Sequence, residues 1–288
     1  MSAKLLDGKL LAAHTKDALK EEIEALKKRT KKIPSLVNIM IGEDAGAQAY
    51  ANSQQKTAEY IGINYKLIAL SVNASQSEIL EQIAQLNKDT LVHGVMIHQP
   101  VPSKIQYDVV INSLNPAKDI EGMSTANLGK MILGQAKIIP CTPAAVMEHI
   151  KSTGEKIRGK EAVVLGRSEI VGKPVSFLLL EQSATVTICH SGTSEAGKLI
   201  DHVKRADIVV AALGKPEFVK GEWIKNGAIV VDVGINKVGN QMIGDVEFEK
   251  AREKASYITP VPGGVGPVTV VMLMKNCLEA FKVQQGVR

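Results

Sequence analysis

The stretch of sequence that decides the fold runs from Ala162 to Pro174 and reads Ala-Val-Val-Leu-Gly-Arg-Ser-Glu-Ile-Val-Gly-Lys-Pro. Its four leading apolar residues are typical of a strand buried in a parallel sheet, and the glycine after them predicts a tight turn into a helix. Because such a glycine lets backbone N–H groups approach a pyrophosphate, the turn predicts a dinucleotide site. A plain strand–turn–helix joint is the structural alternative. The position favours the site, since this is the first strand of an alternating series.

The residues after the second strand of that series indicate which dinucleotide binds. In NAD-binding proteins of this kind, an acidic residue about 20 positions further on holds the ribose 2′-hydroxyl. Here the second strand is followed by His190, Ser191 and Gly192, and no acid occurs before Glu195. Arg167 and Ser191 offer a cation and a hydroxyl, which suit a 2′-phosphate, so NADP is favoured over NAD. As structural alternatives, Arg167 is a surface cation and Ser191 a turn hydroxyl.

Strands and helices alternate on both sides of this stretch, which predicts βαβ units and parallel sheets. Upstream, we expect a helix opened by Asp7, strands at 36–41, 65–70 and 92–97, and helices at 47–61 and after the capping box Ser75–Glu78. Downstream, we expect strands at 185–189, 208–211, 228–233 and 257–258, then a last helix at 268–283 that packs on the first domain.

Prolines and glycines punctuate residues 112–143, and the domain boundary is placed there. Thr142 followed by Pro143 is typical of an N-cap and the first helical residue. The predicted fold class is α/β with two domains and a cleft between them: an N-terminal α/β substrate domain and a C-terminal Rossmann-like NADP domain with a parallel sheet. The first comprises residues 1–120 and 268–288, the second comprises residues 140–267, and residues 121–139 connect them.

The composition of the 288 residues argues against several classes of function. Hydrophobic residues make up 45% and charged residues 23%, as in ordinary soluble domains. Aromatic residues make up only 3%, too few for the stacking surfaces of single-strand nucleic-acid or carbohydrate sites. The net charge of +5 includes one basic run, residues 27–32, which we interpret as a solvated helix end and not as a nucleic-acid patch.

The cysteines and the apolar runs predict the compartment. Cys141, Cys189 and Cys277 are far apart and have no C-x-x-C spacing, which predicts a reducing environment, no disulfide framework and no zinc or other metal site. No apolar run reaches the ~18 residues that a membrane span requires, and the first residues do not resemble a signal peptide. We therefore expect a cytoplasmic protein that contacts neither membrane nor nucleic acid.

Five segments, in order along essentially the whole chain, carry a resemblance to a known family. The most specific is Thr-Pro-Val-Pro-Gly-Gly-Val-Gly-Pro-Val-Thr at 259–269, and the others are residues 140–143, 166–174, 232–236 and 244–246. Together they closely resemble the signature of the bifunctional methylenetetrahydrofolate dehydrogenase/cyclohydrolase family. The resemblance implies an NADP-dependent oxidoreductase of one-carbon metabolism and purine biosynthesis, a tetrahydrofolate derivative as substrate, and a homodimer formed through the cofactor domains.

The resemblance also implies which residues bind the two ligands. NADP would contact Thr142, Gly166, Arg167, Ser168, Val171, Gly172, Ser191, Gly214 and Ile235. The folate would contact Tyr50, Ile97, His98, Gln99 and Glu121, with the turn formed by Pro262, Gly263, Gly264, Val265 and Gly266 closing beside it. The catalytic positions would be Tyr50, Gln54, His98 and Glu121.

Three of these catalytic positions depart from the pattern of the family. The family carries Tyr-x-x-x-Lys where this chain has Tyr50 and Gln54, which share one helix face. Lys56 does not easily replace that lysine, because it lies about 200° further round the helix. The glutamine that holds the lysine in the family is His98 here, and the second aspartate of Lys-Asp-Val-Asp-Gly is Glu121.

These departures affect the two reactions of the family differently. Hydride transfer to nicotinamide mainly needs positioning, whereas hydrolysis of the methenyl product needs an acid–base group that is typically worth about 10²–10⁴-fold. Because glutamine does not titrate, our first hypothesis is a dehydrogenase whose cyclohydrolase activity is lost or weak. A second hypothesis keeps both activities, with His98 as the base oriented by Gln54. A third is a folate-binding protein with little catalysis, in which Glu121 misplaces the pterin ring.

Overall fold

The computed structural model describes residues 2–287 and divides into two compact units. The C-terminal unit comprises the residues up to Ala12 together with Thr142–Thr269, and the N-terminal unit comprises Ala13–Cys141 together with the residues from Val270 on. Each unit contains a parallel sheet and helices, so the two-domain α/β class predicted from the sequence is confirmed. The first residues differ from the expectation: they join the C-terminal unit, because β1 (Lys4–Leu5) pairs in parallel with β11 (Tyr257–Ile258).

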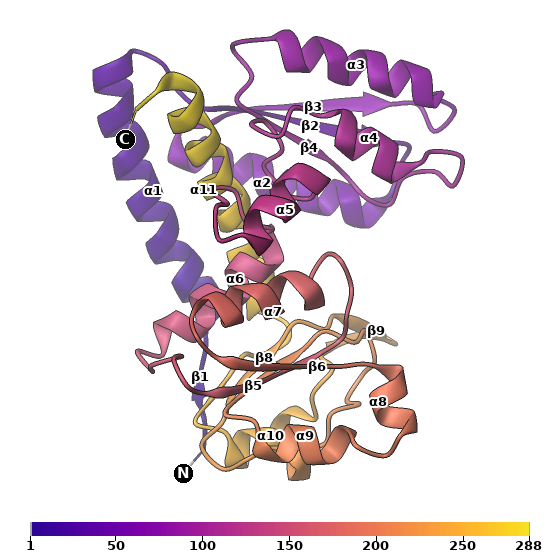
Figure 1. The fold of residues 1–288 in the computed structure, drawn as a ribbon. Helices are drawn as coiled ribbons and strands as arrows, with labels where there is room; N and C mark the ends of the chain where they lie inside the picture. Colours follow the sequence, from indigo (N-terminus) through magenta and orange to yellow (C-terminus); the bar gives the residue numbers. More distant parts are fainter. Residues whose placement is uncertain (1, 288) are drawn as a thin grey trace. The chain divides into compact units, whose positions relative to one another are not determined.

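The C-terminal unit is built on a six-stranded parallel sheet with the order β1-β11-β8-β7-β5-β6. Its other strands are β5 (Glu161–Leu165), β6 (Thr185–Cys189), β7 (Ile208–Ala211) and β8 (Ile229–Asp232). Its helical elements are α6 (Cys141–Ser152), α7 (Gly172–Glu181), α8 (Ser191–Glu195), α9 (Leu199–Arg205), the 3-10 turn Gly221–Trp223 and α10 (Phe248–Lys254). Helices α6 and α7 lie over one face of the sheet, and α9 and α10 lie over the other (Figure 1). Strands β7 and β8 are therefore buried along their whole length, which explains their unbroken apolar sequences.

The order of the strands in this sheet defines where a ligand can bind. The chain passes from β5 outward to β6 and returns to β7 on the other side of β5. In doubly wound sheets, ligands bind beyond the carboxyl ends of the strands at the point where the strand order reverses. The residues that follow β5 and β7 occupy that point.

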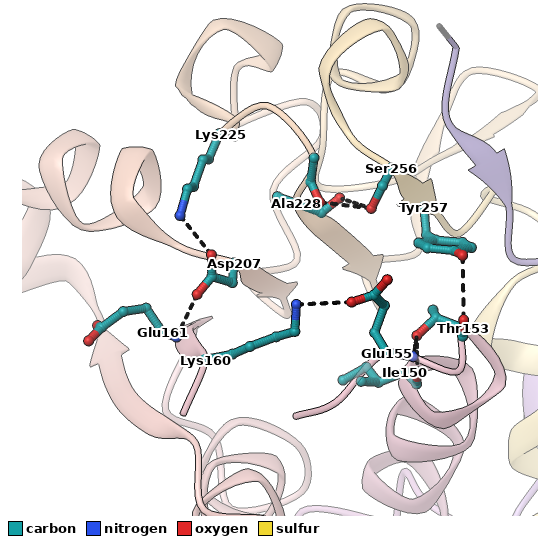
Figure 2. A network of polar contacts seen from close by, with 11 residues as sticks. Ile150, Thr153, Glu155, Lys160, Glu161, Asp207, Lys225, Ala228, Ser256 and Tyr257 are labelled. Atoms are coloured by element: carbon teal, nitrogen blue, oxygen red, sulfur yellow. Dashed lines mark hydrogen bonds and ion pairs between the residues drawn. The ribbon is translucent and has the colours of Figure 1, made fainter. Parts of the chain in front are cut away.

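At the amino ends of the same strands, polar contacts join neighbouring segments (Figure 2). Asp207 accepts a hydrogen bond from the backbone N–H of Glu161 at 2.9 Å and pairs with Lys225 at 2.7 Å. The Tyr257 hydroxyl donates to the carbonyl of Thr153 at 3.4 Å. Partly exposed ion pairs of this kind contribute little each, and this edge of the sheet carries none of the expected ligand-binding residues.

The N-terminal unit contains a three-stranded parallel sheet in which β2 (Ser35–Ile41) lies between β3 (Asn64–Leu70) and β4 (Gly94–Ile97). Its helices are α2 (Ala45–Ile61), α3 (Gln76–Lys88), α4 (Tyr107–Ser113), α5 (Thr125–Ile132) and most of α1 (Gly8–Thr30) and α11 (Val265–Gln285). Side chains alternate across a strand, and Val37 and Ile39 pack into a core that α3 and α4 share. Asn38 therefore points to the opposite face of β2, where the buried side of α2 lies.

The last helix packs within the N-terminal unit. Helices α1 and α11 lie side by side (Figure 1), and Lys282 of α11 forms an ion pair with Glu22 of α1. The Asn276 side-chain amide donates to the carbonyls of Ile120 and Ile139 at 2.8 and 2.7 Å. These contacts hold both ends of the segment 121–139 against α11.

Some elements differ from those expected from the sequence. The N-cap predicted at Thr142 is wrong, because α6 begins one residue earlier and Thr142 lies in its first turn. Within residues 112–143, where only the domain boundary was predicted, Ser124 accepts from the backbone N–H of Asn127 and opens α5. An antiparallel hairpin, β9 (Asn236–Val238) with β10 (Gln241–Ile243), was not expected. These elements are short, so their periodic pattern in the sequence is weak.

Residues 2–287 contain no helix that is both long and apolar enough to cross a membrane. In that same range, no three side chains of His, Cys, Asp or Glu gather as a metal ion would need. Cys141, Cys189 and Cys277 are buried free thiols.

Candidate active site

Helix α2 presents Tyr50 and Gln54 on the same face. Its N-cap is Asp44, whose carboxylate accepts from the backbone N–H of Ala47 at 2.7 Å, and its C-cap is Gly62 in the left-handed conformation. Gln54 is completely buried and Tyr50 partly so, whereas Lys56 is exposed. The prediction that Lys56 faces away from Tyr50 and Gln54 is confirmed.

His98 lies immediately after β4 and meets these residues. Its ring stands edge-on to the ring of Tyr50, with centroids 6.0 Å apart and an interplanar angle of 85°. Only 2% of His98 is exposed, and this burial lowers the pKa of the imidazole to about 4. Because burial penalises the charged form, His98 is neutral at pH 7.

Asn38 completes this group and was not predicted from the sequence. Its side-chain amide nitrogen donates to Gln54 Oε1 and lies 2.9 Å from the Tyr65 hydroxyl and 3.2 Å from His98 Nε2. Gln54 Nε2 in turn donates to Met96 Sδ at 3.3 Å. One signal was available: Asn38 is the only polar residue inside the otherwise apolar run 36–41.

Glu121 stands at the start of the turn that Asp119 organises. The buried Asp119 carboxylate accepts from the backbone N–H groups of Gly122 and Ser124 at 3.0 and 2.8 Å, which shapes this turn. Burial, and then the neighbouring charge of Asp119, raise the pKa of the Glu121 carboxyl to about 8. Glu121 Oε2 is buried and has no hydrogen-bond partner among residues 2–287, although the residue as a whole is partly exposed.

We call Asn38, Tyr50, Gln54, His98 and Glu121 the substrate-side cluster. Burial raises the pKa of the Tyr50 hydroxyl well above its usual value, and the nearby Cys141 and Glu121 act in the same direction. At neutral pH every member is therefore uncharged, with Glu121 mostly protonated. Such a group offers hydrogen-bond donors and acceptors for a ligand but no standing ionic charge.

The other two residues expected near the folate lie at the same strand end. Ile97 is fully buried, and its backbone hydrogen bond to Glu121 favours the ionised carboxylate without overcoming the effect of burial. Gln99 is exposed, and its side chain makes a hydrogen bond with Tyr107. The structure thus brings Tyr50, Gln54, Ile97, His98, Gln99 and Glu121 together in the N-terminal unit.

In the C-terminal unit, the turn after β5 is tightly packed against the turn after β7. Gly166 has φ = 115°, and a Cβ on this residue would lie 2.2 Å from the carbonyl oxygen of Ala212, which follows β7. The two turns at the reversal of strand order therefore touch, and only glycine fits between them. Ser168 Oγ accepts from the backbone N–H groups of Val171 and Gly172 at 3.2 and 3.4 Å, which shapes the entry into α7.

A buried aspartate, Asp245, fixes the turn that follows β7. Its carboxylate accepts from the backbone N–H groups of Leu213, Gly214 and Lys215 at 2.5, 3.0 and 2.8 Å. It also accepts from Asn236 Nδ2 at 2.9 Å, next to the exposed Ile235. Asp245 thus positions two of the segments expected to contact NADP, although it was not itself among the predicted residues.

Asp232, at the end of β8, supports this arrangement. Its carboxylate accepts from the backbone N–H groups of Gly234, Asp245 and Val246 at 3.0, 2.9 and 2.8 Å. Burial raises the pKa of Asp232 to about 7 and the nearby Asp245 carboxylate adds to this, while these hydrogen bonds act in the opposite direction. Both aspartates lie in segments that carry the resemblance to the family, 232–236 and 244–246. The sequence alone did not indicate which groups their carboxylates bind.

The remaining expected contacts also lie in the C-terminal unit. Arg167 and Ser191 are exposed at the ends of β5 and β6, where a cation and a hydroxyl can meet a 2′-phosphate. The turn from Pro262 to Gly266 packs against Gly8. The backbone N–H of Gly8 donates to the carbonyl of Gly263 at 2.9 Å, and a Cβ on Gly8 would lie 1.7 Å from the carbonyl oxygen of Gly264. Thr142 lies in the first turn of α6.

These features agree with what the chain resembles. The tetrahydrofolate dehydrogenase/cyclohydrolase catalytic domain matches residues 6–121, and the NAD(P)-binding domain of the same family matches residues 140–285. The bifunctional protein FolD of Acetivibrio thermocellus is 50% identical over 286 residues, which are 99% of each chain.

Solved structures extend the likeness to the fold. The bifunctional FolD methylenetetrahydrofolate dehydrogenase/cyclohydrolase of Campylobacter jejuni has a TM-score of 0.94 and 39% identity, and the match covers 98% of this chain and 99% of that one. The Trypanosoma brucei FolD, complexed with NADP and an inhibitor, has a TM-score of 0.94 and 38% identity over 98% of both chains. On its sequence and fold, this chain belongs to the tetrahydrofolate dehydrogenase/cyclohydrolase family.

Proposed function

We propose that the chain catalyses the NADP-dependent oxidation of 5,10-methylenetetrahydrofolate to 5,10-methenyltetrahydrofolate. The observation that carries the proposal is the match of both halves of the chain to one family, supported by relatives named as this enzyme and by one that is complexed with NADP. NADP, when bound, would accept a hydride. The chain itself would orient the two ligands, which is the main requirement of hydride transfer.

The turns at the carboxyl edge of the larger sheet would hold the dinucleotide. Backbone N–H groups at Gly166–Ser168 and the entry to α7 would face the pyrophosphate, which favours a helix N-terminus. Arg167 and Ser191 would contact the 2′-phosphate, because they are the cation and hydroxyl exposed at the ends of adjacent strands. Thr142, Val171, Gly172, Gly214 and Ile235 would complete the contacts.

The folate would contact the substrate-side cluster. The protonated carboxyl of Glu121 has an unpartnered buried oxygen that a polar edge of a pterin could satisfy. Tyr50, Ile97, His98 and Gln99 would flank the ring, and the turn from Pro262 to Gly266 would supply backbone groups. We expect a homodimer and a role in one-carbon metabolism from the same family membership.

Hydrolysis of the methenyl product is a second candidate function. The relatives are named bifunctional, which favours the hypothesis that this chain keeps both activities over the hypothesis that hydrolysis is lost. His98 would then be the base. It is in the correct, neutral form at pH 7, but a pKa of about 4 makes it a weak base, since general bases work best when their pKa is close to the working pH.

Separate assays of the two reactions test these proposals. NADPH fluorescence with methylenetetrahydrofolate reports oxidation, and the loss of methenyl absorbance, with methenyltetrahydrofolate supplied directly, reports hydrolysis. If hydrolysis is retained through His98, decay exceeds that in buffer and His98→Gln slows it by about 10²-fold or more. If hydrolysis is lost, the methenyl absorbance decays only as fast as in buffer. Gln54→Lys then restores hydrolysis, whereas Gln55→Lys, at the adjacent exposed position, does not. No NADPH formation would contradict the dehydrogenase proposal and leave folate binding alone.

A further inference from the structure

The buried amide of Asn38 sits at the centre of the substrate-side cluster. Asn38 is 0% exposed and lies on the middle strand of its sheet, opposite Leu67 of β3 and Met96 of β4. A buried amide is costly unless it is hydrogen-bonded. Its partners therefore define what Asn38 contributes to the site.

Those partners come from three different elements. Asn38 Nδ2 faces Gln54 Oε1 of α2, the Tyr65 hydroxyl of β3 at 2.9 Å, and His98 Nε2 beyond β4 at 3.2 Å. Because an amide NH₂ group has two hydrogens, at most two of these contacts are hydrogen bonds at one time. No other side chain among residues 2–287 is recorded in a hydrogen bond with both Gln54 and His98. Asn38 thus joins the two replaced positions through its amide; Tyr50 also joins them, through a hydrogen bond with Gln54 and an edge-on contact with the ring of His98.

The orientation of the Asn38 amide follows from its neighbours. With Nδ2 toward the cluster, the amide donates to the carbonyl oxygen of Gln54, whose own nitrogen is engaged with Met96 Sδ at 3.3 Å. Reversing Asn38 alone would set its Oδ1 against Gln54 Oε1, two acceptors in contact. Reversing both amides would instead set Gln54 Oε1 against Met96 Sδ, which is also an acceptor. The observed arrangement leaves Asn38 Oδ1 without a partner, which costs less than opposing two carbonyl oxygens.

This orientation determines the state of His98. An amide NH₂ group only donates, so the ring nitrogen that it faces must be unprotonated. Neutral imidazole carries one proton, which is therefore on Nδ1, because a proton on Nε2 would face the hydrogens of the Asn38 amide. Burial disfavours the imidazolium as well, and no charged side chain contributes to that effect.

We infer that Asn38 is a positioning residue of this site: its amide fixes the Gln54 side chain and holds His98 as the neutral imidazole with its proton on Nδ1. The inference deepens the proposed function and rests on it for its catalytic meaning. If His98 is the base for hydrolysis, Nε2 must first leave Asn38 before it can take a proton from water. The side-chain arrangement itself can be measured without turnover.

The test is the tautomer of His98 by ¹⁵N NMR of the full-length protein. Long-range ¹⁵N–¹H correlation distinguishes protonated from unprotonated ring nitrogens, and His98→Gln assigns the signals among the six histidines. We expect Nε2 to be unprotonated in the parent protein between pH 6 and pH 8. In Asn38→Val, the ratio of the Nδ1–H tautomer to the Nε2–H tautomer of His98 should fall about fivefold. This factor corresponds to the loss of one hydrogen bond of about 1 kcal/mol.

Two further variants control the result. Ile39→Val removes one methylene from the adjacent buried position of β2 and should leave the tautomer unchanged. Asn38→Asp replaces the donor by an acceptor and should move the proton to Nε2. A protonated Nε2 in the parent, an unchanged tautomer in folded Asn38→Val, or an equal shift in Ile39→Val overturns the inference. If neither Asn38 variant folds, the parent spectrum alone decides. Absence of NADPH formation would contradict only the proposed function.

Discussion

Ionisation of Glu121 should make the stability of this protein depend on pH, and Glu121→Gln should remove the part of that dependence that Glu121 causes. The pKa of the carboxyl is raised from its ordinary 4.5 to about 8, chiefly by burial. A group whose folded-state pKa is raised contributes stability that is complete below its unfolded pKa and is lost as pH rises through the folded pKa. The relevant window for Glu121 is therefore pH 4.5 to about 8.

The size of the effect follows from the two pKa values. Linkage gives a destabilisation by ionisable Glu121 of about 1 kcal/mol at pH 5, about 3 kcal/mol at pH 7 and about 5 kcal/mol at pH 9. These are upper values, because Glu121 is partly exposed and water that reaches it lowers the cost of ionisation. Glutamine keeps the size and the polarity of the side chain but cannot ionise.

Urea unfolding at pH 5, 7 and 9 measures this directly. The free energy of unfolding of Glu121→Gln should exceed that of the parent by an amount that grows by about 2–4 kcal/mol between pH 5 and pH 9. Glu21→Gln, an exposed site on α1, is the matched control and should give a difference that does not change with pH. If the difference for Glu121→Gln is equally independent of pH, the carboxyl is not held protonated and the substrate-side cluster is not uncharged at neutral pH.

Three predictions concern the C-terminal unit. Asp245→Ala removes the acceptor of the three N–H groups of Leu213–Lys215, so NADP should bind at least about tenfold more weakly in a fluorescence titration, with a smaller loss in Asp245→Asn. Gly166→Ala forces a Cβ to 2.2 Å from a backbone oxygen at φ = 115°, and calorimetry should show a loss of about 2 kcal/mol or more together with weakened NADP binding. Gly8→Ala displaces the Gly264 carbonyl, so the KM for the folate should rise. The affinity for NADP should stay within about twofold, because the turns expected to bind the dinucleotide lie elsewhere in the unit. Equal losses for both ligands in Gly8→Ala would contradict that separation.

The regular elements were predictable because each rests on local chemistry. The apolar runs at 36–41 and 208–211 became fully or almost fully buried strands, and Gly62 ended α2 in the left-handed conformation. The Ser75–Glu78 capping box opened α3 with both of its hydrogen bonds. What escaped prediction depends on distant partners: the two residues of β1 become a strand only because β11, more than 250 positions later in the chain, offers them a free edge.

The sequence allowed us to predict which residues of the N-terminal unit lie together, but not their protonation states. The spacing of Tyr50 and Gln54 implied a shared helix face, and the structure places both beside His98. Nothing in a linear sequence states how much water reaches a side chain. The neutral state of His98 and the protonated state of Glu121 follow from burial, which only the folded arrangement sets.

Asn38 also explains why the replaced positions should be considered as one unit. An ammonium group at position 54 would stand at a fully buried site, where a charge is tolerated only with suitable acceptors or an opposite charge. Because an ammonium only donates, the Asn38 amide would have to turn and present its unpartnered Oδ1 to it. Glutamine requires no such turn because its carbonyl oxygen accepts from Asn38. His98 then accepts from the same amide without needing a charge. Polar partners that share one donor couple strongly, so the effect of changing Gln54 depends on the residue at position 38. Gln54→Lys should therefore restore less hydrolysis in an Asn38→Val background than alone, because valine offers the buried ammonium no acceptor.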